Sequence, residues 1–274
     1  MTTTEPNPVD DPLSHQRPII SPYYVAAELL WRRLRWDIVP ESWRSRSRLR
    51  AMRNQHDGEK AVILCNGPSL LKTDFDALGS VFTFGLNKIN LLFEKHAFRP
   101  SCVVSVNPYV IEQNADFFRE TDIPLFLESR AYSHVGPREG VHYLHSTGVH
   151  RFARDVSVSV FESFTVTYVA MQLAFHLGFR QVALVGCDHS FGAKGPANAV
   201  VTSGQEDADH FDPNYFAGGV QWQLPDLVES EISYLRAGKI YAADNRQLVN
   251  CTDGGRLEVF PRQTLAEFLA APPA

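Results

Sequence analysis

Short apolar runs alternate with segments of helical periodicity from about residue 60 to the end of the chain. Most of the runs are continuously apolar, which is typical of strands buried on both faces of a sheet. Their alternation with helices predicts an α/β fold, a single Rossmann-like domain with a mostly parallel sheet. The predicted strands are Ala61–Cys65, Val81–Gly85, Cys102–Val106, Pro124–Leu127, Val182–Val185 and Lys239–Ala242. The predicted helices are Ser69–Leu78, Val110–Arg119, Phe164–Leu177 and Val228–Ala237, with Lys88–Glu94 as a helix or a loop.

The N-terminal part of the chain has a different pattern. Residues 1–18 contain four prolines among Thr, Asn and Asp residues, a composition that predicts disorder. Helical periodicity runs from Tyr23 to Trp36, is interrupted by Pro40, and resumes from Ser42, a candidate helix cap, to Arg53. The predicted division is therefore a disordered start and basic amphipathic helical arm at residues 1–58 and the Rossmann-like domain at residues 59–274.

Positive charge is concentrated in the arm. Eight arginines between Trp31 and Arg53 stand against only Asp37 and Glu41, a local charge of +6 in a chain of net charge −5. The rest of the chain is therefore acidic, which argues against nucleic-acid binding because phosphate neutralisation needs a basic face. Arginine beside tryptophan and leucine is typical of a helix on an anionic membrane surface, and residues 23–53 are the candidate contact. The alternative is an arm that packs its apolar residues on the main domain.

Length and composition exclude several classes of protein. The 274 residues can form one large or two small domains, and 44% hydrophobic with 21% charged residues is ordinary for a globular chain. No stretch is apolar enough to cross a bilayer, and the N-terminus does not resemble a secretory signal. We expect a cytoplasmic protein, at the inner face of the cytoplasmic membrane if the arm binds lipid. Because no two cysteines are closely spaced, all four are expected to be reduced core residues rather than zinc ligands: Cys65, Cys102, Cys187 and Cys251.

Polar residues directly follow four of the predicted strands. Asn66, Asn87 and Asn107 come after the first three, and Asp188 comes shortly after the strand that ends at Val185. In a parallel sheet, ligands bind in the crevice at the carboxyl ends of the strands. Asparagine amides suit a base, a ribose or a phosphate, and an aspartate suits a sugar hydroxyl or a metal ion. Each residue alone could be an ordinary turn residue, but together they predict a polar ligand site.

The turn after the first strand has the sequence Asn66-Gly67-Pro68-Ser69. Gly67 would let the backbone approach a ligand, Pro68 would fix the turn, and Ser69 would cap a helix whose N-terminal amides face an anion. A phosphate-bearing ligand fits this arrangement, and an ordinary strand–turn–helix connection is the alternative. The segment matches neither the dinucleotide-binding glycine pattern nor the Walker loop.

The segment from Asp207 to Phe216 is polar, aromatic and without regular periodicity. Such segments are typical of active-site loops carried on a rigid scaffold. His210 lies among its acidic residues, which raise the basicity of an imidazole, so His210 is a candidate general base. The alternative is a solvated surface histidine.

The order of these features resembles the bacterial sialyltransferases of glycosyltransferase family 42. It is equally similar to the wider group of 6-hydroxymethylpterin diphosphokinase-like domains, which includes flagellin-glycosylation factors. The resemblance covers residues 60 to 268. It rests on Asn66-Gly67-Pro68-Ser69-Leu70, Asn87, Asn107-Pro108, the helix end Leu177-Gly178-Phe179, and the later Gly186-Cys187-Asp188.

The resemblance implies an inverting, metal-independent transferase that needs no cofactor. Its donor would be a CMP-activated acidic sugar such as sialic acid, and its acceptor a glycan or a lipid-linked sugar. It implies that His210 deprotonates the acceptor, Asp188 lies beside the ribose or donor sugar, and Tyr215 assists the departing phosphate. Where sialyltransferases carry Thr-Ser-Gly, this chain has Thr165-Val166-Thr167. The nucleotide-binding residues would be Asn66, Gly67, Pro68, Ser69, Asn87, Asn107, Thr165 and Asp188.

Two other functions remain open, as does the choice between a monomer and a homo-oligomer. One is a diphosphokinase that uses ATP and Mg²⁺ on a pterin alcohol, and the other is a non-catalytic nucleotide-binding scaffold. The kinase would need carboxylate-rich metal ligands, because Mg²⁺ prefers oxygen. Its candidate ligands are Asp188, His189, Asp209 and Asp212.

Overall fold

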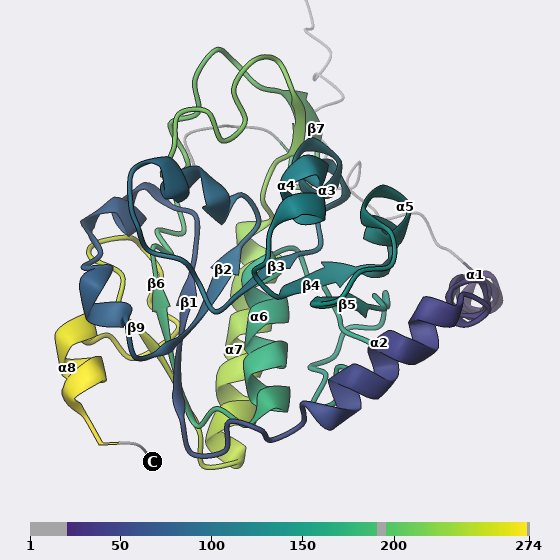
Figure 1. The fold of residues 1–274 in the computed structure, drawn as a ribbon, viewed down its shortest axis with the longest axis horizontal. Coiled ribbons are helices and arrows are strands. Elements are labelled where there is room, and N and C mark those ends of the chain that lie inside the picture. Colours follow the sequence, from purple (N-terminus) through teal and green to yellow (C-terminus); the bar gives the residue numbers. More distant parts are fainter. Residues whose placement is uncertain (1–20, 191–195, 273–274) are drawn as a thin grey trace, which may run out of the picture.

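Seven parallel strands form one central sheet, which confirms the predicted α/β, Rossmann-like fold. The computed structural model describes residues 21–190 and 196–272, and the segment predicted to be disordered, residues 1–18, lies outside them. The strand order is β5-β4-β3-β2-β1-β6-β9 (Figure 1). The strands are β1 (Lys60–Leu64), β2 (Phe82–Leu86), β3 (Cys102–Ser105), β4 (Leu125–Glu128), β5 (Val141–Leu144), β6 (Gln181–Val185) and β9 (Gln247–Asn250).

Both faces of the sheet are covered, because the strands are apolar on both sides. In β1, Ala61 and Ile63 belong to one buried cluster, and Val62 and Leu64 belong to the other. Burial on both faces is what continuous apolar runs favour. The first cluster includes α6 (Val166–Leu177) and α7 (Leu227–Ala243). The second includes residues of α3 (Pro108–Gln113), α4 (Ala115–Glu120), α8 (Leu265–Ala270) and the 3-10 segments Pro68–Lys72, Asp76–Leu78, Ile89–Glu94 and Ser129–Ala131, the last leading into α5 (Tyr132–Val135).

The chain changes direction once across the sheet. Strands β1 to β5 follow one another outward, and α6 then carries the chain back so that β6 pairs with the other side of β1. At such a switch point, the loops after the two central strands leave in opposite directions and open a crevice. A short antiparallel hairpin, β7 (Val200–Thr202) and β8 (Gln221–Gln223), lies in the segment between β6 and α7.

Several predicted elements differ in the structure. The predicted strand Lys239–Ala242 is wrong: it continues α7, where the Tyr241 hydroxyl donates to the Met171 carbonyl at 2.7 Å, and the strand follows at β9. The predicted helix Ser69–Leu78 is two 3-10 segments, and Val110–Arg119 is divided at Asn114. The sequence pattern missed β5, β7 and β8, each only three or four residues long. Short strands give too few positions for a period to emerge.

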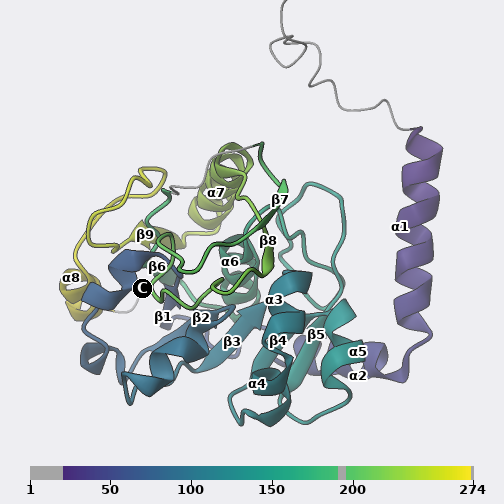
Figure 2. The same ribbon diagram turned by 90° about the horizontal axis from the view of Figure 1, so that it is seen from above.

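The two N-terminal helices are placed differently. Helix α2 (Pro40–Ala51) packs on the body: Ser45 Oγ accepts from the Tyr143 amide at 3.1 Å, and Leu49 is 1% exposed. Helix α1 (Pro22–Asp37) projects from the body (Figure 2). Ser42 does not cap α2, which begins at Pro40; its hydroxyl donates to Asp37 Oδ1 at 3.1 Å. Among the described helices, none is both long enough and apolar enough to span a bilayer.

All four cysteines are buried free thiols, as the sequence predicts. They lie at separate positions in the strands and strand ends that form the core. Burial raises the pKa of the Cys102 thiol well above its ordinary value. These thiols therefore behave as core residues.

A glycine links the end of α6 to the segment after α2. Gly178 ends α6 with a φ of 104°, in the left-handed region that glycine adopts readily. A Cβ atom there would lie 2.9 Å from the Asn54 Cα and 3.0 Å from the Asp57 amide. The two segments are joined by backbone hydrogen bonds from Asn54 N to His176 O and from His56 N to Leu177 O. The close approach therefore holds α2 against the core.

We expect Gly178→Ala to lower the free energy of unfolding by about 3 kcal/mol, because it adds backbone strain and a backbone clash. Gly254→Ala is the matched control: Gly254 has a φ of 84° but nothing within 4 Å of an added Cβ. The control should cost about 1 kcal/mol from strain alone. Thermal and urea denaturation of both variants measure the difference. Equal losses would mean that the approach of the two segments adds nothing.

Candidate functional site

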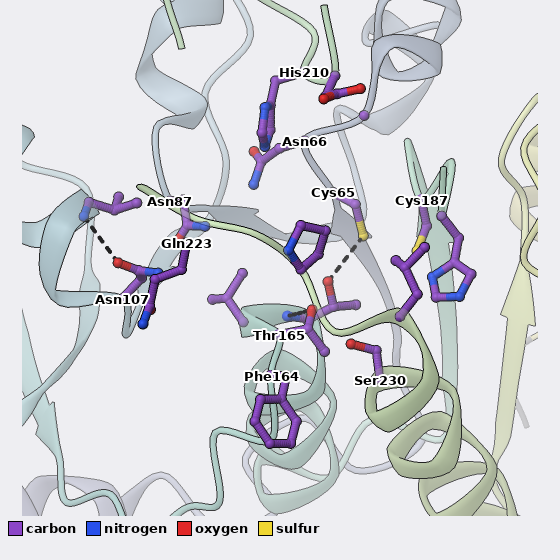
Figure 3. A pocket seen from close by; sticks show the side chains of 18 of the residues that line it. Cys65, Asn66, Asn87, Asn107, Phe164, Thr165, Cys187, His210, Gln223 and Ser230 are labelled. Carbon is purple, nitrogen blue, oxygen red and sulfur yellow. Dashed lines mark hydrogen bonds between the residues drawn. The ribbon is translucent and has the colours of Figure 1, made fainter. Parts of the chain in front are cut away.

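A cavity of about 270 Å³ lies at the carboxyl ends of the central strands, where the sheet topology opens a crevice. It is lined by residues after β1, β2, β3 and β6, by the first turn of α6, and by the segments on either side of β8. The three asparagines, Thr165 and His210 line it (Figure 3), and so does Asp188. The structure therefore brings together residues that are far apart in the sequence. Pro68 and Ser69 are not among the lining residues.

The three asparagines differ in how their side chains are held. Asn107 Oδ1 caps α3, accepting from the Tyr109 amide at 2.9 Å, and its NH₂ group takes no part in the cap. Asn87 Oδ1 accepts from Ser105 Oγ at 3.2 Å. Asn66 Oδ1 is buried and has no hydrogen-bond partner among the described residues. Asn107 can therefore be a turn residue and a ligand contact at once. The Asn66 side-chain oxygen is an acceptor that a ligand could satisfy.

The turn after β1 binds the side-chain carboxylate of Asp188. Ser69 donates to Asp188 Oδ2 from its amide at 3.1 Å and from its hydroxyl at 2.8 Å. A Cβ on Gly67 would lie 2.0 Å from the same oxygen, so only glycine allows this approach. The expectation that Ser69 caps a helix is wrong, because Gly67 is the N-cap of Pro68–Lys72. The Asp188 carboxylate occupies the donors of Ser69 that were expected to face a phosphate, and Pro68 is exposed. Asp188 itself lines the cavity.

His210 is held by an aspartate and by aromatic rings. Its Nδ1 lies 2.8 Å from Asp207 Oδ2, and its ring stacks on Tyr215 with centroids 4.1 Å apart and planes 2° apart. The Phe211 amide donates to the Asn66 carbonyl at 2.9 Å, which ties this loop to the turn after β1. Burial would raise the pKa of Asp207, but the hydrogen bond and charge of His210 hold it below its ordinary value. The pair therefore has an ionised carboxylate that orients an imidazole at the cavity.

Tyr215 lines the cavity and stacks against the imidazole of His210. Its side chain is 1% exposed, and burial raises the pKa of its hydroxyl. Lys88 Nζ donates to the Tyr215 carbonyl at 2.6 Å and to Gln113 Oε1 at 2.8 Å. Burial lowers the pKa of Lys88 to about 8. The stacking makes Tyr215 a positioning residue for His210, and its expected help to a departing phosphate stays a prediction.

The first turn of α6 points into the cavity. Thr165 is its N-cap, and Thr165 Oγ1 accepts from the Thr167 amide at 3.3 Å. The same hydroxyl lies 3.3 Å from the Tyr234 hydroxyl, and Thr167 Oγ1 lies 3.7 Å from Cys65 Sγ. A helix N-terminus carries a partial positive charge that favours an anionic group nearby. Thr165 thus shapes the start of α6 at the cavity wall.

Three of the four candidate magnesium ligands, Asp188, His189 and Asp209, line the cavity, and the fourth does not. Asp212 is 3% exposed, lies outside the cavity lining, and accepts from Lys95 Nζ at 2.7 Å. His189 lines the cavity, but its Nε2 lies 2.9 Å from Glu231 Oε1. Within residues 21–190 and 196–272, no group of three or more His, Cys, Asp or Glu side chains has an arrangement that could hold a metal ion. The donor set that the kinase interpretation needs does not fit.

Sequence reasoning missed Asp207 and Glu162. Asp207 could have been found, because an acid three residues before a histidine in an irregular loop can reach its ring. Glu162 lines the cavity and lies 3.0 Å from Arg130, with Glu128 nearby. Burial and the charge of Glu128 raise the pKa of Glu162 to about 7. No sequence pattern could identify Glu162, because its partners come from the end of β4.

A solved structure and a family model are similar to this chain. A solved structure titled as the MAf glycosyltransferase from Magnetospirillum magneticum AMB-1 is similar, with a TM-score of 0.47 and 16% sequence identity. The similarity covers 81% of this chain and 38% of that one, so this chain spans well under half of that protein. No curated protein matches the chain. A family model described as 6-hydroxymethylpterin diphosphokinase MptE-like matches residues 41–194, more than half of the chain, and the protein therefore belongs to the MptE-like family.

Proposed function

We propose that this protein is an inverting glycosyltransferase that moves a sugar from a CMP-activated donor to a hydroxyl of a glycan or lipid-linked acceptor. The observation that carries the proposal is the Asp207–His210 pair, held at a cavity that also collects Asn66, Asn87 and Asn107. An imidazole oriented by a carboxylate is the arrangement that general-base catalysis needs. The choice of cytidine and of an acidic sugar such as sialic acid rests on the resemblance of the strand-end motifs to sialyltransferases.

The charge of the cavity favours a donor with a single phosphodiester. Among the described residues, no lysine or arginine lines it, and the donors there are neutral amides, hydroxyls and the start of α6. One negative charge can be satisfied by such donors. A triphosphate would need cations, and the described carboxylates form no metal-binding group. The proposed reaction therefore runs without a metal ion.

In the proposed reaction, the acceptor oxygen attacks the anomeric carbon as the bond from that carbon to the phosphate oxygen breaks. With Nδ1 of His210 donating to Asp207, the neutral imidazole has its lone pair on Nε2, which takes the acceptor proton. The phosphate leaves as CMP, and direct attack inverts the anomeric centre. Asp207 stabilises the imidazolium that forms.

The other predicted residues have proposed roles that follow from their positions. Asn66, Asn87 and Asn107 bind the nucleotide, with Thr165 shaping the start of α6 near the phosphate. Asp188 faces the ribose or donor sugar. Gly67, Pro68 and Ser69 act indirectly, by forming the turn that holds Asp188.

A second candidate function is transfer of diphosphate from ATP to a pterin alcohol, which the description of the family model favours. A third is nucleotide binding without catalysis. The three functions differ in ligand, in metal requirement and in the need for His210, and each of these differences can be measured.

We expect CMP without metal to raise the melting temperature most among CMP, CDP, UDP, GDP and ATP. At 100 times Kd the shift should be roughly 5–10 °C for a chain of this size. Asn66→Ala should raise the Kd for CMP about ten-fold, because it removes one side-chain partner at small structural cost. Asn90→Ala is the control, since Asn90 pairs with Asn114 outside the cavity lining. Stabilisation by ATP with Mg²⁺ alone would favour the kinase instead.

We expect His210→Ala to lower kcat for CMP release from CMP-sialic acid, with water as acceptor, by about 10²–10⁴-fold. Asp207→Asn should lower kcat by a smaller factor, because it disturbs the imidazole without removing it. CMP binding by calorimetry should be nearly unchanged in both. His134→Ala, outside the cavity lining, is the control. Full activity in His210→Ala would leave only the non-catalytic function.

The raised pKa of Glu162 predicts a pH dependence of nucleotide binding. Below about pH 7 Glu162 is neutral, and above it the carboxylate repels a phosphate in the same cavity. The Kd for CMP methyl ester, a phosphodiester of constant charge, should therefore rise about three- to ten-fold from pH 6 to pH 8. Glu162→Gln should remove the part of this rise that comes from Glu162. Identical pH profiles would show that Glu162 stays ionised or distant.

A further inference from the structure

Helix α1 has one face on the protein and another face that no described residue covers. Trp36 is 7% exposed, and its ring centroid lies 6.0 Å from that of Tyr132 and 5.9 Å from that of Tyr143. Arg33 lies on the same side, where its guanidinium donates to the Val158 carbonyl and to Asp37. These contacts fix the direction of the helix as it leaves the body (Figure 2).

The unpartnered face is a continuous apolar stripe. Its members recur at intervals of four, three, one, three and four residues, which places them on one side of an α-helix. Five of them rank among the most exposed large apolar side chains of the described chain, at 58–85%. Scattered single apolar residues are ordinary on a protein surface, whereas a contiguous set marks an interaction site. The stripe consists of Tyr23, Ala27, Leu30, Trp31, Leu34 and Ile38.

Positive charge borders this stripe. Arg35 lies on α1 beside it, and Arg32 lies farther round the helix, where it pairs with Glu28 at 2.7 Å; both arginines are exposed. Trp43, 61% exposed at the start of α2, donates from its Nε1 to the Asp37 carbonyl at 2.7 Å, which places another amphipathic ring at the same junction. Arg35 and Arg50 form no ion pair with any described residue. An apolar stripe with aromatic rings and flanking arginines is complementary to an anionic lipid surface.

We propose that α1 is a membrane-surface helix that inserts its apolar stripe among the headgroups of an anionic bilayer. This inference does not depend on the proposed glycosyl transfer. The alternative partner for the stripe is a second copy of the chain, but pairing two copies along the stripe would bring their arginines together. Anionic headgroups neutralise the same arginines, and tyrosine and tryptophan are the side chains that favour the lipid–water interface.

Sedimentation of the full chain with vesicles tests this proposal. We expect binding to vesicles of 30% phosphatidylserine in phosphatidylcholine, binding at least ten-fold weaker to pure phosphatidylcholine, and loss of most binding at 0.5 M salt. A variant with Leu30→Ser, Trp31→Ser and Leu34→Ser should bind at least ten-fold more weakly. Replacing both Arg32 and Arg35 by Gln should weaken binding to the anionic vesicles by about five-fold per charge.

A matched control separates the stripe from general surface hydrophobicity. Val228, Ile232 and Leu235 on α7 are 45–70% exposed, and their triple replacement by Ser should bind vesicles like the unmodified chain. Melting temperatures of both triple variants should stay close to the original, because all six side chains are exposed. No binding to anionic vesicles, or equal binding by the two triple variants, would overturn the proposal. A dimer in analytical ultracentrifugation that only the α1 variant dissociates, with no vesicle binding, would identify a second copy as the occupant.

Discussion

The Asp188 carboxylate joins the loops that follow β1 and β6, and the candidate site depends on this junction. Two donors of Ser69 bind one of its oxygens, and Gly67 leaves the space that this oxygen needs. The two strands are neighbours only because α6 returns the chain across the sheet. Without the carboxylate, the donors of the turn after β1 would lack a partner, and the floor of the cavity would lose its shape.

The His210 loop depends on that same turn. The Phe211 amide donates to the Asn66 carbonyl, while the Tyr215 carbonyl accepts from the buried Lys88. Stacking on Tyr215 and the bond to Asp207 then leave the imidazole little rotational freedom. A long loop thereby gains the rigidity that catalysis by a side chain requires, because an oriented base loses less entropy in the transition state. The proposed chemistry rests on this rigidity.

The basic arm is two helices with different environments. Helix α2 has buried polar residues that bond to the edge strand β5, while α1 keeps only one face on the protein. Both helices are rich in arginine and tryptophan, so composition alone could not separate them. The difference arises from which side chains meet a partner: Leu49 lies in the core, and Leu34 is 58% exposed.

Local pattern was sufficient for strands β1 to β4 and β6, the long helix α6 and the four polar strand ends, because continuous apolar runs and the residues after them are properties of neighbours in the chain. It could not decide what Ser69 binds, since its partner is Asp188, far along the sequence and adjacent only through β6. The same holds for Glu162, whose partner Arg130 follows β4. The run Lys239–Ala242 matches a strand as well as a helix in sequence, because a buried residue such as Tyr241 is compatible with both elements. The amino-acid sequence by itself determined the central strands, the helix between β5 and β6, and the polar edge. Only tertiary structure decided which donors are already occupied, because hydrogen bonds between distant loops form only when the sheet brings them together.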